Sequence, residues 1–96
     1  MLSKNDADFY TNLEKKLAKT SSWPSSYLYK FIVPTSGTKI KKLVELFDNL
    51  GAVIKTKQSS KGKFTSVSIQ LTMRTPKSVI EKYKEVGDKI DGVISL

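Results

Sequence analysis

The chain contains no cysteine and no histidine. Without cysteine, it cannot form disulfides, thiol nucleophiles or thiolate zinc sites. Without histidine it lacks the usual general base near neutral pH, and neither a Ser-His-Asp nor a Cys-His arrangement can form within it. Catalysis would depend on lysine, tyrosine or carboxylates alone. We therefore expect no enzyme activity, no bound metal and no cofactor.

Long apolar runs are also missing. No run approaches the ~20 residues of a membrane helix, and the first residues show no apolar stretch behind a basic one, so we expect no secretory signal and a cytoplasmic protein. The 96 residues, 39% of them hydrophobic, suit one small globular domain. The net charge of +8 would attract nucleic acid, anionic metabolites or acidic partners.

The N-terminal part is predicted to be a helix over Asp6–Lys19, because Phe9, Leu13 and Leu17 recur every four residues. A linker, Thr20–Ser26, follows, with Trp23 as its one large anchor. The expected division is therefore 1–26, a helix and linker, and 27–96, a folded domain.

The rest of the chain alternates between strand and helix patterns. The strand at 63–73 is the plainest, since apolar Val67, Ile69 and Leu71 alternate with polar residues. The helix near the middle has apolar residues at helical spacing, namely Ile40, Leu43, Val44, Phe47 and Leu50, and Gly51 follows as its cap. The predicted elements are strand 27–33, helix 38–50, strands 52–57 and 63–73, a helix opened by Thr75-Pro76, and strand 92–96.

The resulting order is β-α-β-β-α-β, so the predicted fold class is α+β. Two right-handed β-α-β units, interleaved, give an antiparallel sheet in the order 4-1-3-2 with both helices on one face. This is the ferredoxin-like sandwich, here with an extra N-terminal helix. Many unrelated functions use this fold, so it does not choose among them.

The stretch Ser59–Ile69, SSKGKFTSVSI, combines glycine and lysine as a phosphate-binding loop would. It fails the Walker A pattern, because Lys57 stands at the first glycine position, Phe64 replaces the hydroxyl residue, and a strand follows. We expect Gln58–Gly62 to form a hairpin loop, with Gly62 at positive φ. RNA-recognition motifs share the strand order, but their stacking positions are Lys63 and Thr65 here, which disfavours RNA binding by the sheet.

The same stretch, preceded by the linker SSWPSS and a lysine-bearing first strand, resembles the YbeD-like family of bacterial domains of unknown function. The similarity covers most of the chain from Trp23 onward. The resemblance implies a ferredoxin-like fold akin to ACT domains, which sense amino acids and other small metabolites. It implies no established activity.

Two basic clusters are candidate sites. The first lies at the start of the predicted helix 38–50, where lysines crowd the positive end of the helix dipole, and an anion there would also satisfy free backbone donors. Its candidate residues are Ser36, Gly37, Thr38, Lys39 and Lys42, and solvated lysines are the alternative reading. The second cluster surrounds the hairpin and comprises Lys55, Lys57, Lys61 and Lys63, which would equally protect an edge strand from pairing.

Other polar groups have structural explanations. Glu85, Asp88 and Asp91 match no cation-binding loop, so we expect a solvated helix end. Tyr27, Tyr29 and Tyr83 are expected in the core, with their hydroxyl ends in water.

The sequence therefore favours a non-enzymatic regulatory or ligand-binding domain that binds a small anionic metabolite or a protein partner. The alternative is weak, sequence-nonspecific nucleic-acid binding through the basic hairpin. A homodimer is expected, because the last strand, Val93–Leu96, is an apolar edge without a lysine.

Overall fold

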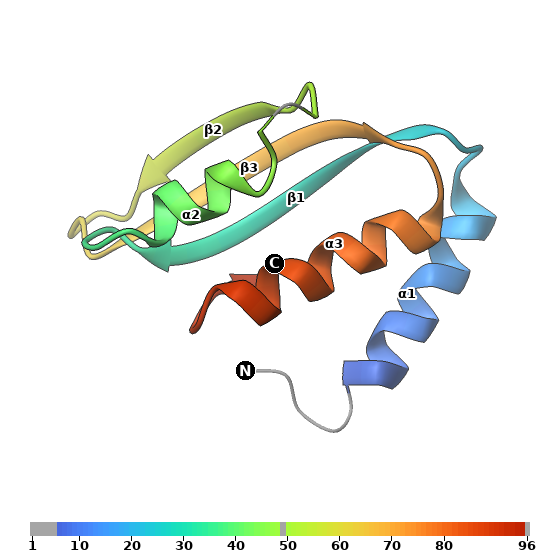
Figure 1. Cartoon of the computed structure of the whole chain (residues 1–96), viewed down its shortest axis with the longest axis horizontal. Coiled ribbons are helices and arrows are strands. Elements are labelled where there is room, and N and C mark those ends of the chain that lie inside the picture. Colours follow the sequence, from blue (N-terminus) through green and yellow to red (C-terminus); the bar gives the residue numbers. More distant parts are fainter. Residues whose placement is uncertain (1–5, 49, 96) are drawn as a thin grey trace.

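The computed structural model describes residues 6–48 and 50–95 of the chain, and gives backbone positions only for 6 and 7. The elements are α1 (Asp6–Thr20), β1 (Ser25–Pro34), α2 (Lys39–Glu45), β2 (Val53–Gln58), β3 (Phe64–Met73), α3 (Pro76–Lys89) and β4 (Ile94–Ser95). This is an α+β protein with three helices and four strands in the described residues (Figure 1). None of these helices is both long and apolar enough to cross a membrane.

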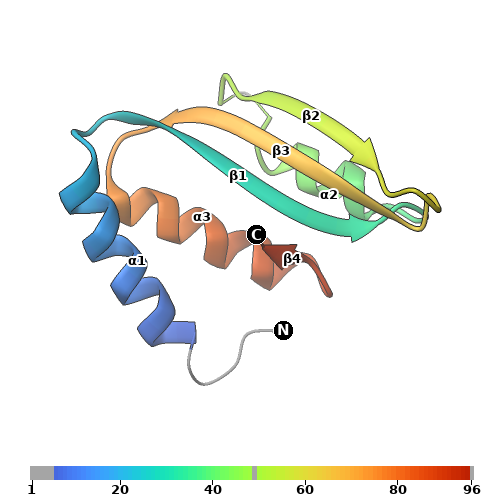
Figure 2. The same cartoon turned by 180° about the vertical axis from the view of Figure 1, so that it is seen from behind.

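The four strands form one antiparallel sheet in the order β2-β3-β1-β4. Numbered from the other edge, the order is β4-β1-β3-β2. The two central strands pair over ten residues each, from Ser25 opposite Met73 to Pro34 opposite Phe64. In contrast, β4 pairs only with Phe31 and Ile32. The sheet is therefore long through β1 and β3 and short at the β4 edge (Figure 2).

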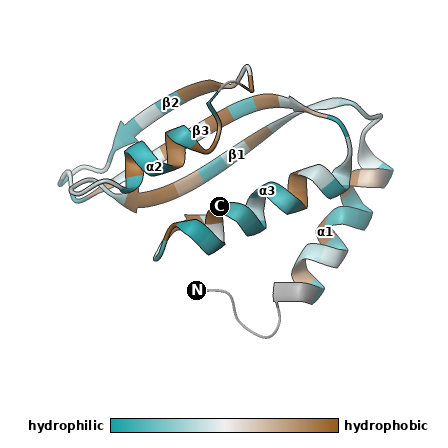
Figure 3. Ribbon diagram, in the orientation of Figure 1, coloured by the Kyte–Doolittle hydropathy of each residue, from teal (hydrophilic) through white to brown (hydrophobic). Residues whose placement is uncertain are grey.

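Alternation of polar and apolar residues explains the two faces of the sheet, and the bands along β1 and β3 in Figure 3 follow it. The odd-numbered residues of the two strands point into the core: Tyr29, Phe31, Val33, Val67, Ile69 and Leu71 are all buried. Both later helices pack on this face. α3 contributes Val79, Ile80, Tyr83 and Val86, while Leu43 of α2 and Phe47 just after it complete the layer.

The start of α3 follows its sequence signal. Thr75 is the N-cap, its side chain accepts a hydrogen bond from the Ser78 amide at 3.0 Å, and the Ser78 hydroxyl accepts one from the Thr75 amide at 3.2 Å. Pro76 then occupies the first turn, where its missing N–H costs nothing. The helix continues past Gly87 to Lys89.

The N-terminal helix packs against α3, and Leu13 and Leu17 of the predicted stripe take part in its packing while Phe9 does not. Tyr10 is buried and its ring stacks on Tyr83 with centroids 6.3 Å apart, while Leu13 and Leu17 pack at the edge of the core. Phe9 is 59% exposed, so its place in the stripe was wrong. Residues 10, 13 and 17 follow the 3.6-residue period of a helix, whereas strict four-residue spacing drifts off the face.

The anchoring role of Trp23 is confirmed. Its ring packs against the core and its indole N–H donates to the Leu17 carbonyl at 3.0 Å. This bond ties the linker to the end of α1.

The second helix is shorter than its apolar spacing indicated. It ends at Glu45, turns carry the chain onward through Phe47, and Leu50 is 48% exposed. Gly51 does adopt a positive φ of 72°. The last strand is likewise reduced to Ile94–Ser95, and Leu96 lies outside the described residues.

The tyrosine hydroxyls also differ from expectation, because they are bonded inside the protein. The Tyr29 hydroxyl donates to the Val79 carbonyl at 3.1 Å, and the hydroxyls of Tyr27 and Tyr83 lie 2.8 Å apart. Burial raises the pKa of Tyr29 well above its ordinary value, with a smaller contribution from Tyr27. Burial, then the hydrogen bond with Tyr27, raises the pKa of Tyr83 in the same direction. These rings hold the sheet to α3 rather than reaching water.

Candidate ligand-binding surface

The face of the sheet opposite the core carries lysines and exposed apolar side chains. Register places Lys30 of β1, Ser68 of β3 and Lys55 of β2 in one row across it. Neighbouring rows contain Leu28, Gln70 and Val53 on one side, and Ile94, Ile32, Ser66 and Lys57 on the other. We call this surface, from Leu28 to Phe64, the open face.

No aspartate or glutamate of the described residues lies on the open face. The nine acidic residues of the chain all fall in α1, α2, α3 or the turns directly after α2 and α3. The strands and the hairpin between β2 and β3 contain no aspartate or glutamate. The two layers of the protein therefore differ in charge: the sheet is purely basic, whereas the helical layer is mixed.

The open face is also unusually apolar for a surface. Six large hydrophobic side chains are exposed in the described residues, and four of them lie here: Leu28, Val53, Phe64 and Ile94. The exposed fractions run from 47% to 58%. Clusters of this kind on a soluble domain commonly mark an interaction surface.

The side chains of the open face are short along the middle of β3, at Ser66 and Ser68, and longer at its ends, at Gln70 and Phe64. β3 presents the small side chains of Ser66 and Ser68, while β1 and β2 present longer aliphatic and lysine side chains on either side. At the hairpin end the open face has a hollow of about 490 Å³, lined by Ile32, Phe64, Lys57 and Ser66 with Gln58, Ser59 and Ser60. A ligand here would meet an apolar wall, hydroxyl groups and a cation.

The hairpin itself closes as its sequence indicated, shifted by one residue. Ser59 donates to the Phe64 carbonyl at 2.8 Å, Gly62 donates to the Ser59 carbonyl at 2.9 Å, and Gly62 has a φ of 71°. The loop is Ser59–Lys63 rather than Gln58–Gly62.

All four predicted lysines of the hairpin region are exposed. Lys55 and Lys57 belong to the open face, whereas Lys61 and Lys63 lie in the hairpin loop between the paired strands. The structure places Lys30 and Lys55 in one row with Ser68 between them, which the spacing along the chain does not reveal. Strand parity could have found Val53, Phe64 and Ile94 as well, once the pairing register was known.

The stacking surface of an RNA-recognition motif is incomplete. Thr65, at one stacking position, is only 2% exposed and its hydroxyl lies 2.8 Å from that of Thr35 in the core layer. Phe64 is the one aromatic ring on the open face.

The predicted anion loop has a different local geometry. Thr38 caps α2 without a side-chain hydrogen bond, Gly37 has a φ of 88°, and α2 is seven residues long. The Lys39 ammonium donates to the Asp91 carbonyl at 2.6 Å, so it is already engaged. Lys42 faces away from this loop, into a shallow hollow of about 300 Å³ with Glu45, Leu46, Lys89 and Ile90. The loop therefore brings together Ser36–Lys39, while Lys42 lies apart from it.

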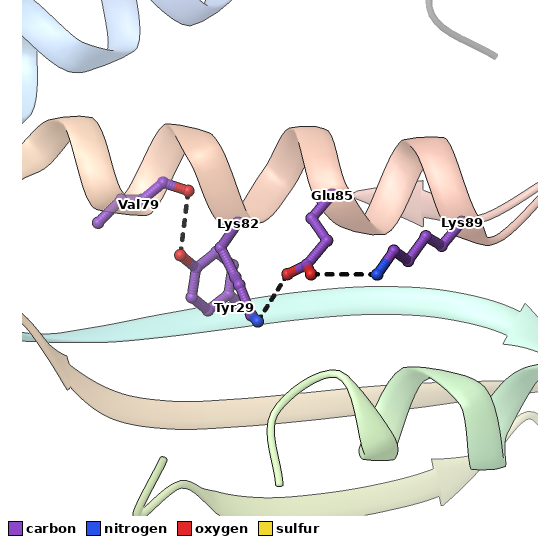
Figure 4. A network of polar contacts seen from close by, with 5 residues as sticks. All are labelled: Tyr29, Val79, Lys82, Glu85 and Lys89. Atoms are coloured by element: carbon purple, nitrogen blue, oxygen red, sulfur yellow. Dashed lines mark hydrogen bonds and ion pairs between the residues drawn. The ribbon is translucent and has the colours of Figure 1, made fainter. Parts of the chain in front are cut away.

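Lys82, Glu85 and Lys89 of α3 form a network of ion pairs (Figure 4). Lys82 lies 2.7 Å from Glu85 and 5.0 Å from the centre of the Phe47 ring, and Lys89 lies 3.5 Å from the other Glu85 oxygen. The Lys82 hydrogen bond holds the pKa of Glu85 below its usual range. Within the described residues no group of three carboxylates could hold a metal ion, so Asp88 and Asp91 form no such site.

Comparison with known proteins gives a family but no activity. No curated protein and no solved structure shows significant similarity to the chain. The family model described as "Protein of unknown function (DUF493)" matches residues 18–94, which span the linker and all four strands. Residues 6–17, most of α1, lie outside the match. The chain therefore belongs to the DUF493 family, the YbeD family of proteins of unknown function.

Proposed function

We propose that this chain is a non-enzymatic regulatory domain that binds an anionic partner through the open face of its sheet. We also infer that its β-α-β-β-α-β core is ferredoxin-like and related in arrangement to ACT domains. The observation that carries the proposal is the segregation of charge: lysines and exposed apolar groups share a face to which the described residues contribute no aspartate or glutamate.

Electrostatics supports an anionic ligand. Lys30, Lys55 and Lys57 project from one surface with no described acidic neighbour on it to neutralise them. Like charges held close together repel one another, which raises the free energy of the unbound protein. A bound anion relieves this repulsion, so anion binding is favoured. The resemblance to ACT domains supports a regulatory role for such binding.

Nucleic acid is the second candidate, since the exposed hairpin lysines would contact phosphates in a sequence-independent way. Phe64, the one exposed ring among the described residues of the open face, offers one stacking contact, whereas single-strand binders align several. A ligand that carries apolar groups as well as carboxylates therefore accounts better for the exposed apolar residues that accompany the lysines.

A titration tests the proposed surface. Citrate and a polyglutamate peptide would be added to labelled protein, and amide chemical shifts would be followed. We expect the largest shifts on β1, β2 and β3, and their loss in the double variant Lys30→Glu, Lys55→Glu.

The double variant Lys15→Glu, Lys19→Glu is the matched control, because it changes the net charge equally at exposed positions of α1. Equal loss of binding in both variants would show that only net charge matters. Shifts confined to the helical layer would refute the open face as the site.

A further inference from the structure

We propose that the partner bound on the open face is an acidic amphipathic helix of another protein, with apolar residues at two points of one face and carboxylates between them. This inference rests on the proposed function and names the class of partner. It follows from the shape of the open face, the order of its side chains and the backbone hydrogen bonds that are available to a segment lying on a sheet.

The shape favours a helix. β1 and β2, on either side of β3, are two strand spacings apart, or about 9.5 Å. A helix lying over β3, with a diameter of ~10–12 Å including its side chains, would therefore reach over both β1 and β2 and meet side chains of both. The floor along β3 consists of Ser66 and Ser68, so a bulky element can approach the sheet there.

Backbone chemistry favours a helix over an extended segment. The peptide groups of β3 already bond to β1 and β2 on both sides. An extended chain on the face would therefore find no backbone partners and would have to leave its own donors and acceptors unpaired. A helix satisfies its backbone donors and acceptors with internal hydrogen bonds, so it can contact the sheet through side chains alone.

The order of side chains along the open face specifies the partner further. Leu28 and Val53 lie on either side of Gln70 in one row, and Lys30 and Lys55 lie on either side of Ser68 in the next. In the third row Ile32 lies across Ser66 from Lys57, with Ile94 beside Ile32 and Phe64 beyond. Leu28 and Ile32 stand four residues apart on β1, about 13.6 Å, and helix positions seven or eight residues apart, which share one face, span about 10.5–12 Å. A complementary helix carries apolar anchors two turns or slightly more apart and acidic residues between them on both flanks.

A second copy of this chain does not fit by the same face. Lys30 and Lys55 of each copy would meet the lysines of the other, and like charges brought together across an interface cost affinity. Polyanions without apolar groups would leave the four exposed hydrophobic side chains in water.

The test uses three synthetic probes and the full chain. The first is an alanine-based helical peptide of about 18 residues, long enough to hold helix in water, with leucine anchors two turns apart and glutamates between them. The second has the same composition in scrambled order, and the third is a thymidine 12-mer. Binding would be measured by calorimetry and mapped by amide chemical shifts.

We expect the first peptide to bind at least about tenfold tighter than the scrambled peptide, because only it presents both anchors together. Lys30→Glu with Lys55→Glu should weaken both peptides, whereas Leu28→Ser with Val53→Ser should weaken only the first. All four positions are exposed, so the fold is retained, and melting temperature checks this. Shifts should lie on Leu28, Ile32 and Ser68.

Two outcomes overturn the helix while leaving the anionic surface in place: equal affinity of the two peptides with the same dependence on the lysines, or tighter binding of the oligonucleotide on the same face. Binding of every probe that is unaffected by the lysine variant overturns both the helix and the proposed function.

Discussion

The ammonium group of Lys39 lies 2.6 Å from the carbonyl oxygen of Asp91 and donates a hydrogen bond to it. The bond joins the first residue of α2 to the turn after α3, 52 positions later in the chain. A lysine at the positive end of a helix is unfavourable in isolation. In this structure the hydrogen bond to the Asp91 carbonyl offsets the unfavourable position of the Lys39 charge, without any bound anion.

Inorganic phosphate is expected to perturb the open face more than the loop Ser36–Lys39. Lys39 already bonds to a carbonyl, whereas Lys30 and Lys55 face solvent with no described aspartate or glutamate on their face. Amide chemical shifts during a phosphate titration measure the difference. Larger shifts at Gly37 and Thr38 would instead support the anion site predicted from the sequence.

Stability should fall at alkaline pH because of the buried tyrosines. The pKa of Tyr29 is raised on folding, so its contribution is complete below the unfolded pKa of about 10 and is lost as the pH rises above it. Urea denaturation between about pH 8 and pH 11 measures the decline.

Tyr29→Phe should reduce this alkaline decline. At neutral pH the variant should lose about 0.5–1.5 kcal/mol, the net value of one hydrogen bond, because the Val79 carbonyl loses its donor. An unchanged slope with pH in the variant would show that other groups control alkaline stability.

Acid should remove a smaller contribution at Glu85. Its pKa is lowered by the Lys82 hydrogen bond, so this stabilisation is present above the ordinary value of 4.5 and disappears as the pH falls through the folded pKa. The pair is partly exposed, and we expect roughly 0.3–0.5 kcal/mol from it. Glu85→Gln should flatten the stability profile in this range, while Glu81→Gln, exposed on the same helix, should not.

The N-terminal helix should contribute to stability through Tyr10 and not through Phe9. Tyr10→Ala removes a buried ring that stacks on Tyr83 and should cost about 3 kcal/mol. Phe9→Ala changes an exposed side chain and should cost less than about 0.5 kcal/mol. Denaturation midpoints compare the two, and equal effects would show that α1 is held in some other way.

Self-association is expected at the β4 edge of the sheet. β4 pairs with two residues of β1, so no described strand lies beside Ser25–Lys30 on that side. Light scattering should give the mass of a dimer, and Ile94→Lys should shift it to monomer because a charge discourages edge pairing. Leu50→Lys, exposed elsewhere, is the control. A monomer at high concentration would contradict the prediction.

The sequence by itself determined the order of the elements, the inward faces of β1 and β3, the capped start of α3, the Gly62 turn and the family. These features depend on local propensity and on periods of 2 and 3.6 residues, which are legible without partners. The early end of α2, the burial of Tyr10 instead of Phe9, and the internal bonding of the tyrosine hydroxyls required the tertiary structure. The local pattern leaves each of these features open, and packing against α3 or the sheet decides it. The open face follows the same rule: its lysines are visible in the sequence, but only strand register places Lys30 and Lys55 in one row on either side of Ser68.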